Sequence, residues 1–405
     1  MREHTRLLVL SVSAGNGHVR AAQALCASAA LRPQQDCEAL HIDAMAHVLG
    51  GFRRVYTSGY LRLVENYPEV WSYLHQKADA TPHSARTQQL RRGIERLSAR
   101  ALLREVRRCA PDAIVCTHFL PAELLMRERL RGRLTCPVWL QVTDFDLHNM
   151  WCVPGLSGYF AATPEVAFRL RARGIDPARI HVTGIPLMPA FAQRDTSPAG
   201  RARCAAGLGL DPARQTVLMM AGGSGGGDLA GTVERALALP GDFQLLAVAG
   251  RNAAALARLQ QLALAHPQRL RAIGFTDHID TLMAAADLVV SKPGGLTVSE
   301  CLALGRPLLL VSPIPGQEEH NAGFLLEEGA AWLAYDAIGL DYKLARLMAD
   351  PHALAALAAN SRRLGRPDAA RAVLAHVLGH LPRARAAAHT APSATPMAPT
   401  AEHAA

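Results

Sequence analysis

Short apolar runs alternate with glycine-rich turns and helix-length stretches along most of the chain. Residues 6–12 form an apolar run that ends in the turn SAGNGH at 13–18, and an alanine-rich stretch follows at 19–30. The order of apolar run, turn and helix-length stretch returns at 112–125 and 158–174. Such runs are typical of buried parallel strands that are joined by helices. The pattern predicts an α/β fold.

A polar stretch divides this pattern into two parts. Residues 193–214 are polar and rich in small side chains, and we interpret them as a linker. We therefore expect one Rossmann-like domain at 1–192 and a second at 215–381. Residues 382–405 are rich in Ala, Pro, Thr and His and contain little that can be buried, so we expect a disordered tail.

The stretch 287–323 contains more candidate ligand-binding residues than any other part of the sequence. Its pattern predicts a strand, a glycine turn, a helix, a second strand and a polar loop. Open α/β sheets bind ligands outside the carboxyl ends of their strands, and the free N–H groups of a helix N-terminus favour phosphate. We therefore expect a phosphate-containing ligand here. The residues that we assign to it are Gly294, Gly295, Thr297, Glu300, Gln317, Glu318 and Asn321.

A second glycine-rich loop follows the predicted strand at 216–220. Residues 222–227 comprise five glycines and one serine, which is more than an ordinary turn requires. A loop without side chains lets backbone N–H groups surround a diphosphate or a sugar. It lacks the Lys and the Ser or Thr of a Walker P-loop, which argues against ATP hydrolysis. We assign Gly222, Gly223, Ser224 and Gly225 to the ligand site.

The motifs KPGGLTVSE and QEEHN together resemble the C-terminal domain of UDP-sugar glycosyltransferases of the GT-B fold. The motifs TDF at 143–145 and TGIP at 183–186 are also similar to that family, so the resemblance covers most of residues 6–335. The nearest group looks like the monogalactosyldiacylglycerol synthases and the processive diacylglycerol glucosyltransferases. The N-acetylglucosaminyltransferase of peptidoglycan synthesis is similar at a greater distance. The resemblance implies two Rossmann-like domains that face a cleft.

The resemblance also implies roles for individual residues of the second domain. Glu300 would bind the uridine ribose, and Gly294 and Gly295 would approach the diphosphate. The backbone of Phe275 would contact the uracil. Arg251 stands at the carboxyl end of the strand predicted at 243–252 and belongs to the same site. The sugar would be held by Gln317, Glu318 and Asn321.

His18 is the candidate general base. It follows Gly15 and Gly17 where a helix is predicted to begin. A helix N-terminus lowers the pKa of an imidazole and keeps it neutral, as a base requires. The resemblance implies that this histidine faces the acceptor hydroxyl, whereas the alternative is a histidine that only caps or packs the turn. His118 and Asp144 follow later strands and are further candidates for the acceptor side of the cleft.

Aromatic residues are concentrated between positions 52 and 73, in a chain that is only 5% aromatic. Aromatic rings interleaved with arginine suit the headgroup region of a membrane. The resembling lipid glycosyltransferases use this part of the chain for their lipid acceptor. The alternative is an insertion with a solvated basic face. Our candidates for acceptor or membrane contact are Arg53, Arg54, Tyr60 and Trp71.

Composition narrows the choice of partners and of cellular compartment. The net charge is +9 with only three lysines, so arginine provides nearly all of the positive charge. This balance fits an anionic membrane surface, an anionic nucleotide or a nucleic acid. No apolar run reaches the roughly 18 residues that span a bilayer. The first apolar run leads into a glycine turn and not into a cleavage site, so we expect a cytoplasmic protein.

The eight cysteines are scattered without a C-x-x-C pair, and their spacing argues against a zinc site or a disulfide framework. The motif DFD at 144–146 has the spelling of a metal–diphosphate site but lies in the predicted acceptor domain. We therefore expect no metal and no cofactor, since the UDP-sugar is a substrate.

The family resemblance implies an inverting glycosyltransferase, and we expect it at the inner face of the cell membrane. It would move a hexose from a UDP-sugar to a lipid acceptor, diacylglycerol or a related lipid, and would not bind nucleic acid. One alternative is an enzyme that uses UDP-N-acetylglucosamine, either a peptidoglycan-type transferase or a 2-epimerase. Another is a non-catalytic basic binding protein. The identity of the sugar and the oligomeric state stay open.

Overall fold

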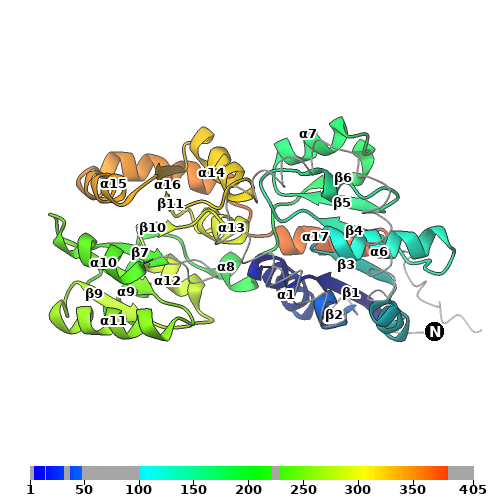
Figure 1. Ribbon diagram of the computed structural model, residues 1–405, viewed down its shortest axis with the longest axis horizontal. Helices are drawn as coiled ribbons and strands as arrows, with labels where there is room; N and C mark the ends of the chain where they lie inside the picture. The colour runs from blue at the N-terminus through cyan, green and yellow to red at the C-terminus, as the bar shows by residue number, and fades with distance from the viewer. Residues whose placement is uncertain (1–3, 14, 32–36, 48–99, 221–227, 382–405) are drawn as a thin grey trace, which may run out of the picture.

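The computed structural model describes residues 4–13, 15–31, 37–47, 100–220 and 228–381. Two six-stranded sheets, one in each half of the chain, lie next to each other along the long axis of the molecule (Figure 1). Every strand pairs with its neighbours in parallel. The predicted α/β fold with two Rossmann-like domains is therefore confirmed.

The first sheet has the strand order β2-β1-β3-β4-β5-β6. Its inner strands are buried along their whole length, which explains their continuous apolar sequences. The strands are β1 (Thr5–Ser11), β2 (Cys37–Asp43), β3 (Ala113–Cys116), β4 (Val138–Gln141), β5 (Gly158–Ala161) and β6 (Ile180–Val182). The helices are α1 (Asn16–Ala30), α6 (Phe119–Leu130) and α7 (Pro164–Ala172), with short 3-10 turns at Ala44–His47, Asn149–Trp151 and Pro177–Arg179.

The second sheet has the order β12-β11-β10-β7-β8-β9. The chain runs from β7 outward to β9 and then crosses back to β10, so the strand order reverses between β7 and β10. The strands are β7 (Gln215–Met220), β8 (Phe243–Val248), β9 (Leu270–Ile273), β10 (Leu288–Ser291), β11 (Leu308–Val311) and β12 (Ala331–Ala334). The helices are α10 (Leu229–Ala238), α11 (Ala253–Ala265), α12 (Ile279–Ala285), α13 (Gly295–Ala303), α14 (Gln317–Glu327), α15 (Ala337–Ala349) and α16 (Pro351–Leu364).

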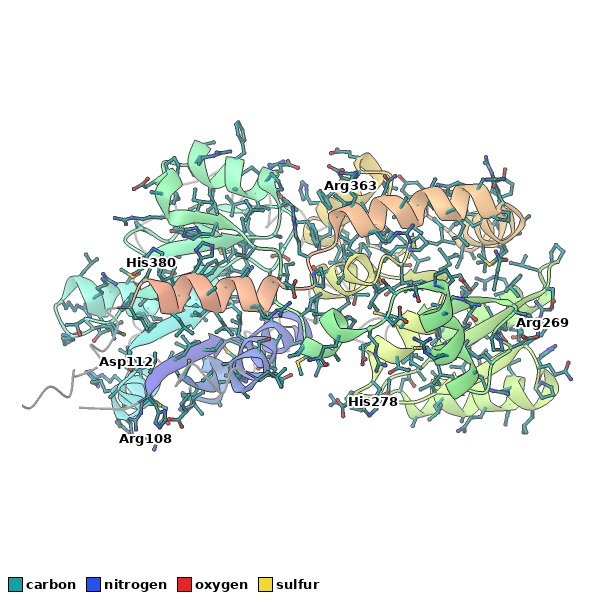
Figure 2. All side chains as sticks on the ribbon, turned by 180° about the vertical axis from the view of Figure 1, so that it is seen from behind. Arg108, Asp112, Arg269, His278, Arg363 and His380 are labelled. Atoms are coloured by element: carbon teal, nitrogen blue, oxygen red, sulfur yellow. The ribbon has the colours of Figure 1, made fainter. Side chains whose placement is uncertain are left out.

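The connections between the two sheets contain further helices. The segment that we interpreted as a linker forms α9 (Pro198–Gly207), which packs against α12 of the second domain. It follows the short helix α8 (Pro189–Gln193). The last helix, α17 (Ala369–Gly379), returns to the first domain and packs on α1 (Figure 1). Viewed from behind, α17 leads to His380 beside the first sheet (Figure 2).

The domains share buried surface. One apolar cluster contains Phe145 and Ile185 of the first domain together with Val298 and Leu325 of the second. The ring of Phe145 stacks on that of Phe324, with 4.9 Å between the ring centroids. Because this cluster is continuous across the boundary, it fixes the carboxyl edges of the two sheets relative to each other. Among the helices that the structure describes, none is both long and apolar enough to span a bilayer.

Candidate functional site

His18 lies in the first turn of α1, at the carboxyl edge of the first sheet. Its Nδ1 is 3.0 Å from the carbonyl oxygen of Thr117 and 2.8 Å from the hydroxyl oxygen of Thr143. A carbonyl oxygen can only accept a hydrogen bond, so Nδ1 carries the proton and donates it. The neutral imidazole therefore has an unprotonated Nε2, which is the acceptor that a general base needs.

Two neighbouring strands position the partners of His18. Thr117 directly follows β3, Thr143 follows β4, and these strands pair in parallel. Thr117 also donates its hydroxyl to the backbone oxygen of His18, at 2.9 Å. Burial lowers the pKa of His18 to about 4, and the hydrogen bond to Thr117 opposes this shift. The imidazole is therefore neutral near pH 7.

His118 lies beside His18 but has the opposite tautomer. It is the N-cap of α6, and its Nδ1 accepts a hydrogen bond from the backbone N–H of Leu120 at 3.1 Å. In the neutral ring the proton is therefore on Nε2, which donates and cannot accept. Burial holds the pKa of His118 well below its usual value, and the nearby His18 and His148 lower it further. The alternative that we considered for His18 was a histidine that only caps a helix. The structure shows this arrangement for His118.

Asp144 is buried in the segment that follows β4, next to Thr143. The carboxylate two residues later, that of Asp146, is 3.3 Å from Arg169 and 3.6 Å from His320 of α14. Gly15 is exposed just before α1. Four residues predicted for the acceptor side therefore lie with His18 at one edge of the first sheet. They are Gly15, Gly17, His118 and Asp144.

The first turn of α13 meets the first domain. A Cβ added to Gly295 would lie 2.5 Å from the carbonyl oxygen of Thr143, so this close approach requires glycine. A Cβ added to Gly17 would lie 3.8 Å from the Cβ of Leu296, which is ordinary contact. The N-termini of α1 and α13 therefore lie against each other. Gly294 is the N-cap of α13.

Glu300 lies in the second turn of α13 and is only 6% exposed. Burial raises the pKa of its carboxyl to about 8; Arg20 of α1 lowers it and Asp280 raises it further. Within the described part of the chain, the side-chain carboxyl of Glu300 makes no hydrogen bond. A buried carboxyl without a partner is costly in the empty protein, and it can accept hydrogen bonds from the hydroxyls of a ligand. Thr297, one turn earlier, is partly buried.

The loop residues predicted to hold the sugar lie in the first turns of α14. Glu318 accepts a hydrogen bond from the backbone N–H of Ile314 at 2.8 Å. Asn321 is 1% exposed, and its amide bridges two backbone groups: Oδ1 accepts from Phe145 N–H and Nδ2 donates to Pro293 O, both at 3.0 Å. Asn321 thus connects the two domains. The side chain of Gln317 lies outside the described residues.

Arg251 and Phe275 lie at the far end of the second sheet, after β8 and β9. The guanidinium carbon of Arg251 is 4.4 Å from the ring centroid of Phe275, which is cation–π geometry. The Phe275 ring is 55% exposed. An exposed aromatic ring supported by arginine offers a flat surface to a nucleobase. Several predicted residues lie outside the described residues, namely Gly222, Gly223, Ser224, Gly225, Arg53, Arg54, Tyr60 and Trp71.

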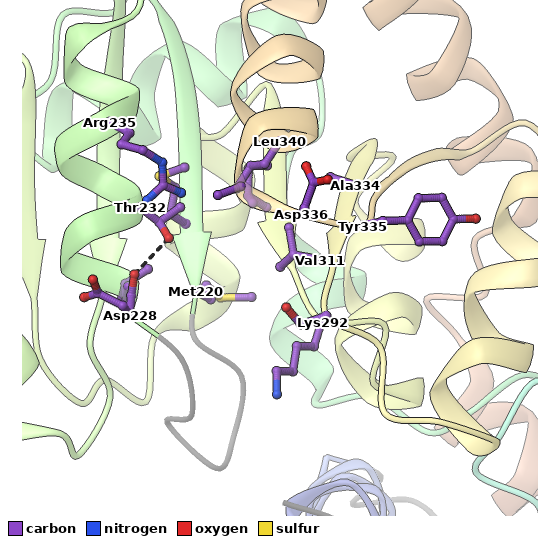
Figure 3. A pocket seen from close by; sticks show the side chains of 15 residues that line it. Met220, Asp228, Thr232, Arg235, Lys292, Val311, Ala334, Tyr335, Asp336 and Leu340 are labelled. Carbon is purple, nitrogen blue, oxygen red and sulfur yellow. Dashed lines mark hydrogen bonds between the residues drawn. The ribbon is translucent and has the colours of Figure 1, made fainter. Parts of the chain in front are cut away.

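A pocket of about 230 Å³ opens at the carboxyl ends of β7, β10, β11 and β12 (Figure 3). Asp228, Arg235 and Asp336 belong to its lining. Lys292, which directly follows β10, also lines it, and its amine points away from the other labelled side chains. Among the residues that the structure describes, Lys292 has no ion-pair partner within 4.0 Å. It is therefore a cation that is available to a phosphate, at the point where the strand order reverses.

Three residues of this region were not predicted from the sequence: Arg20, Thr117 and Lys292. Lys292 had the clearest signal, because it is one of three lysines in an arginine-rich chain and precedes the glycine turn. Thr143 stands in the TDF motif, but nothing local to that motif indicates His18 as its partner. No group of three or more His, Cys, Asp or Glu in the described ranges is arranged to hold a metal ion.

The buried carboxyl of Glu300 predicts a particular pH dependence of stability. Its pKa is raised in the folded protein, so its favourable contribution is complete at pH 4 and is lost as the pH rises through about 8. Glu300→Gln removes this term. The variant should therefore gain thermal stability relative to the wild type as the pH rises from 5 to 9. Its binding free energy for UDP should be weaker by about 1–3 kcal/mol.

Thermal unfolding at several pH values and calorimetry with UDP would measure these two effects. Glu234→Gln is the matched control, since Glu234 is exposed on α10, and it should change neither quantity. A difference in melting temperature between Glu300→Gln and the wild type that is the same at every pH would contradict the prediction.

Comparison with protein families gives one match for each domain. Residues 18–187 match the model of monogalactosyldiacylglycerol (MGDG) synthase, and residues 217–373 match that of the glycosyltransferase family 28 C-terminal domain. Two solved structures show the same fold. Acinetobacter baumannii MurG has a TM-score of 0.61 at 16% identity, covering 93% of this chain and 99% of that one. A putative UDP-N-acetylglucosamine 2-epimerase from Listeria monocytogenes has a TM-score of 0.59 at 15% identity, covering 94% and 97%.

Curated relatives align along most of the chain. The processive diacylglycerol beta-glucosyltransferase of Bacillus pumilus is 29% identical over 350 residues, which cover 82% of this chain and 83% of the relative. That of Bacillus licheniformis is 27% identical over 396 residues, covering 93% and 96%. Each of the two domains thus matches a glycosyltransferase family. The protein is thus a glycosyltransferase with the GT-B fold, in which a domain that matches monogalactosyldiacylglycerol synthase is followed by one that matches the glycosyltransferase family 28 C-terminal domain.

Proposed function

We propose that the protein transfers a hexose from a UDP-sugar to the hydroxyl of diacylglycerol or a related lipid, with inversion at the anomeric carbon. The observation that carries this proposal is the 3.0 Å contact of His18 Nδ1 with the Thr117 carbonyl, which leaves Nε2 free to accept a proton where α1 meets α13. A base for an acceptor hydroxyl thereby lies next to the helix predicted to bind the diphosphate. The relatives named as diacylglycerol glucosyltransferases support the lipid acceptor.

In the proposed reaction, the lipid hydroxyl attacks the anomeric carbon as its proton moves to Nε2 of His18. A bond forms between the anomeric carbon and the lipid oxygen, and the bond to the phosphate oxygen breaks, so that UDP leaves. The Nδ1–H of His18 stays on the Thr117 carbonyl, which orients the ring throughout. The backbone N–H groups at the start of α13 and the amine of Lys292 would stabilise the leaving diphosphate.

The carboxyl of Glu300 would accept hydrogen bonds from the ribose hydroxyls. Burial deprives this carboxyl of hydrogen bonds from water. The two hydroxyls of a bound ribose would donate hydrogen bonds in place of that water. The ring of Phe275 with Arg251 would support the uracil from the other side. These contacts bind the UDP part of the substrate equally before and during transfer, so they affect affinity more than the rate of the chemical step.

The direct test of this function is a substrate panel. The purified protein would be incubated with UDP-glucose, UDP-galactose or UDP-N-acetylglucosamine and vesicles that contain diacylglycerol, and the lipids analysed by mass spectrometry. We expect a hexosyl-diacylglycerol with one of the first two donors. A 2-epimerase would convert UDP-N-acetylglucosamine without any lipid. Binding of nucleic acid without turnover of any UDP-sugar would favour the non-catalytic alternative.

The role of His18 predicts two different acid limbs in the pH profile. The limb of kcat/KM reports the free enzyme, so it should lie near pH 4, well below the usual value for histidine. The limb of kcat reports the complex and should lie at higher pH, because the negative diphosphate favours the imidazolium form. His18→Ala should lower kcat by about 10²–10⁴-fold and remove both limbs, with little change in UDP affinity.

His118→Asn is the matched control, because asparagine also caps a helix N-terminus. It should retain both limbs. If an acid limb persists unchanged in His18→Ala, another group is the base, and Asp144 is the next candidate. His18 would then have only a structural role.

We further propose that the protein works at an anionic membrane surface. The support is the net charge of +9 and the aromatic and arginine residues between positions 52 and 73. Binding to vesicles that contain phosphatidylglycerol should exceed binding to phosphatidylcholine vesicles, and it should weaken as salt rises. Replacing Arg53, Arg54 and Trp71 with alanine should reduce binding while sparing UDP affinity.

Vesicle sedimentation measures this effect. The control variant removes two arginines from the second domain, Arg258 and Arg363, and so separates net charge from location. Both side chains are more than half exposed and form surface ion pairs, which contribute about 0–1 kcal/mol to stability. Equal binding to both kinds of vesicle at low salt would overturn the proposal.

A further inference from the structure

The segment Thr143–Phe145 is held from both domains at once. On the side of the first domain, the Thr143 hydroxyl lies 2.8 Å from Nδ1 of His18. On the side of the second, the Thr143 carbonyl lies against Gly295, where a Cβ would approach it to 2.5 Å. A single residue therefore contacts the candidate base through its side chain and the start of α13 through its backbone.

Asn321 fixes this segment to the turn before α13. Its side chain is buried, and its amide accepts from the N–H of Phe145 and donates to the carbonyl of Pro293, each at 3.0 Å. The ring of Phe145 is held as well, since it stacks on Phe324 of the same helix as Asn321. A primary amide is suited to this position because it accepts with one atom and donates with the other.

We propose that Asn321 is a positioning residue that sets the orientation of His18 relative to the start of α13, acting through Thr143–Phe145. This inference rests on the proposed function, in which His18 is the base and α13 binds the diphosphate. The chain of contacts runs from Pro293 through the Asn321 amide to Phe145, and from Thr143 of the same segment to the His18 ring. A change in the position of the second domain would thereby change the position of the base.

Chemistry explains why such a link is needed. The acceptor hydroxyl is deprotonated from the first domain while the leaving group is stabilised from the second, so the two domains must be in register when the bond forms. A misplacement of about 1 Å in such a site costs on the order of 10²-fold in rate. Asn321 and Gly295 define that register by direct contact with backbone atoms, which cannot change rotamer.

The role that the family resemblance implied for Asn321 is contact with the donor sugar, and the two roles make different demands. Both Oδ1 and Nδ2 of Asn321 already bond to backbone, which leaves one N–H and one lone pair of the amide. A sugar-binding residue would affect the affinity for the UDP-sugar more than that for UDP. A positioning residue would affect turnover and the state of the His18 ring, and would leave both affinities nearly unchanged.

The decisive variants are Asn321→Asp and Thr143→Val. Aspartate keeps the shape of asparagine and still accepts from Phe145, but it has no N–H for the Pro293 carbonyl. Valine keeps the shape of threonine without its hydroxyl, and Thr143→Ser restores the hydroxyl. We expect both decisive variants to lower kcat by about 10–100-fold with UDP affinity within about 3-fold of the wild type. Thr143→Ser should recover most of the rate.

The control is Asn360→Ala. Asn360 also donates its side-chain amide to a backbone carbonyl, that of Gly329 at 3.0 Å, but this bond lies within the second domain. It should change thermal stability without changing kcat. If Asn321→Asp unfolds, the pair Thr143→Val and Thr143→Ser still tests the inference. The combination of Asn321→Asp with Thr143→Val should cost less than the product of the single effects, because both act through one segment.

A spectroscopic readout separates this inference from the proposed function. Nitrogen NMR of labelled histidine shows which ring nitrogen of His18 is protonated and at which pH it titrates, and it requires no turnover. We expect the Nδ1–H form in the wild type and a changed titration in Thr143→Val and Asn321→Asp. His118 and His148 face the same region, so His18 must be assigned with His18→Ala.

The outcomes are distinct. If no lipid product forms in the substrate panel but the His18 titration changes as expected, the proposed function fails and the coupling stands. If lipid product forms while the titration in both variants equals that of the wild type, the coupling is wrong. Loss of UDP-sugar affinity in Asn321→Asp, with an unchanged pH profile, would establish the sugar-contact role and overturn the positioning role.

Discussion

The site depends on the close contact of the Thr143–Phe145 backbone with the first turn of α13. This contact requires glycine at position 295, because a Cβ there would lie 2.5 Å from the Thr143 carbonyl oxygen. Any other residue would push α13 away from the first domain and separate the two halves of the site. The apolar cluster around Phe145 then buries the surface on either side of the contact. The GT-B cleft is thus defined by backbone packing and not only by side chains that face each other.

The same helix carries a buried acid, Glu300, whose burial lowers the stability of the second domain at neutral pH and above. The carboxyl of Glu300 is buried and makes no hydrogen bond among the described residues, and burial raises its pKa to about 8. A folding optimum would place an apolar side chain or an amide there. Retaining a carboxyl at a cost in stability is typical of positions selected for a ligand. Arg20 of α1 lowers that cost only in part, because burial has the larger effect on the pKa of Glu300.

The fold could be predicted almost entirely from sequence, because parallel strands buried on both faces have continuous apolar sequences, and β3, β4 and β5 do. His18 and Glu300 could be singled out because each lies within two helical turns of a glycine turn that is visible in the sequence. Their partners could not. Thr117 and Thr143 are 99 and 125 residues from His18, and only the strand order brings them together. The packing of α17 on α1 had no local signal either.

The tautomers of His18 and His118 show how backbone contacts can assign roles that residue type leaves open. The rings lie 4.7 Å apart and both have lowered pKa values, so neither proximity nor basicity distinguishes them. Their Nδ1 atoms meet opposite backbone groups: a carbonyl in one case and an N–H in the other. The carbonyl leaves Nε2 of His18 able to accept a proton, whereas the N–H leaves Nε2 of His118 already protonated. Of these two histidines, only His18 can therefore serve as a base through Nε2.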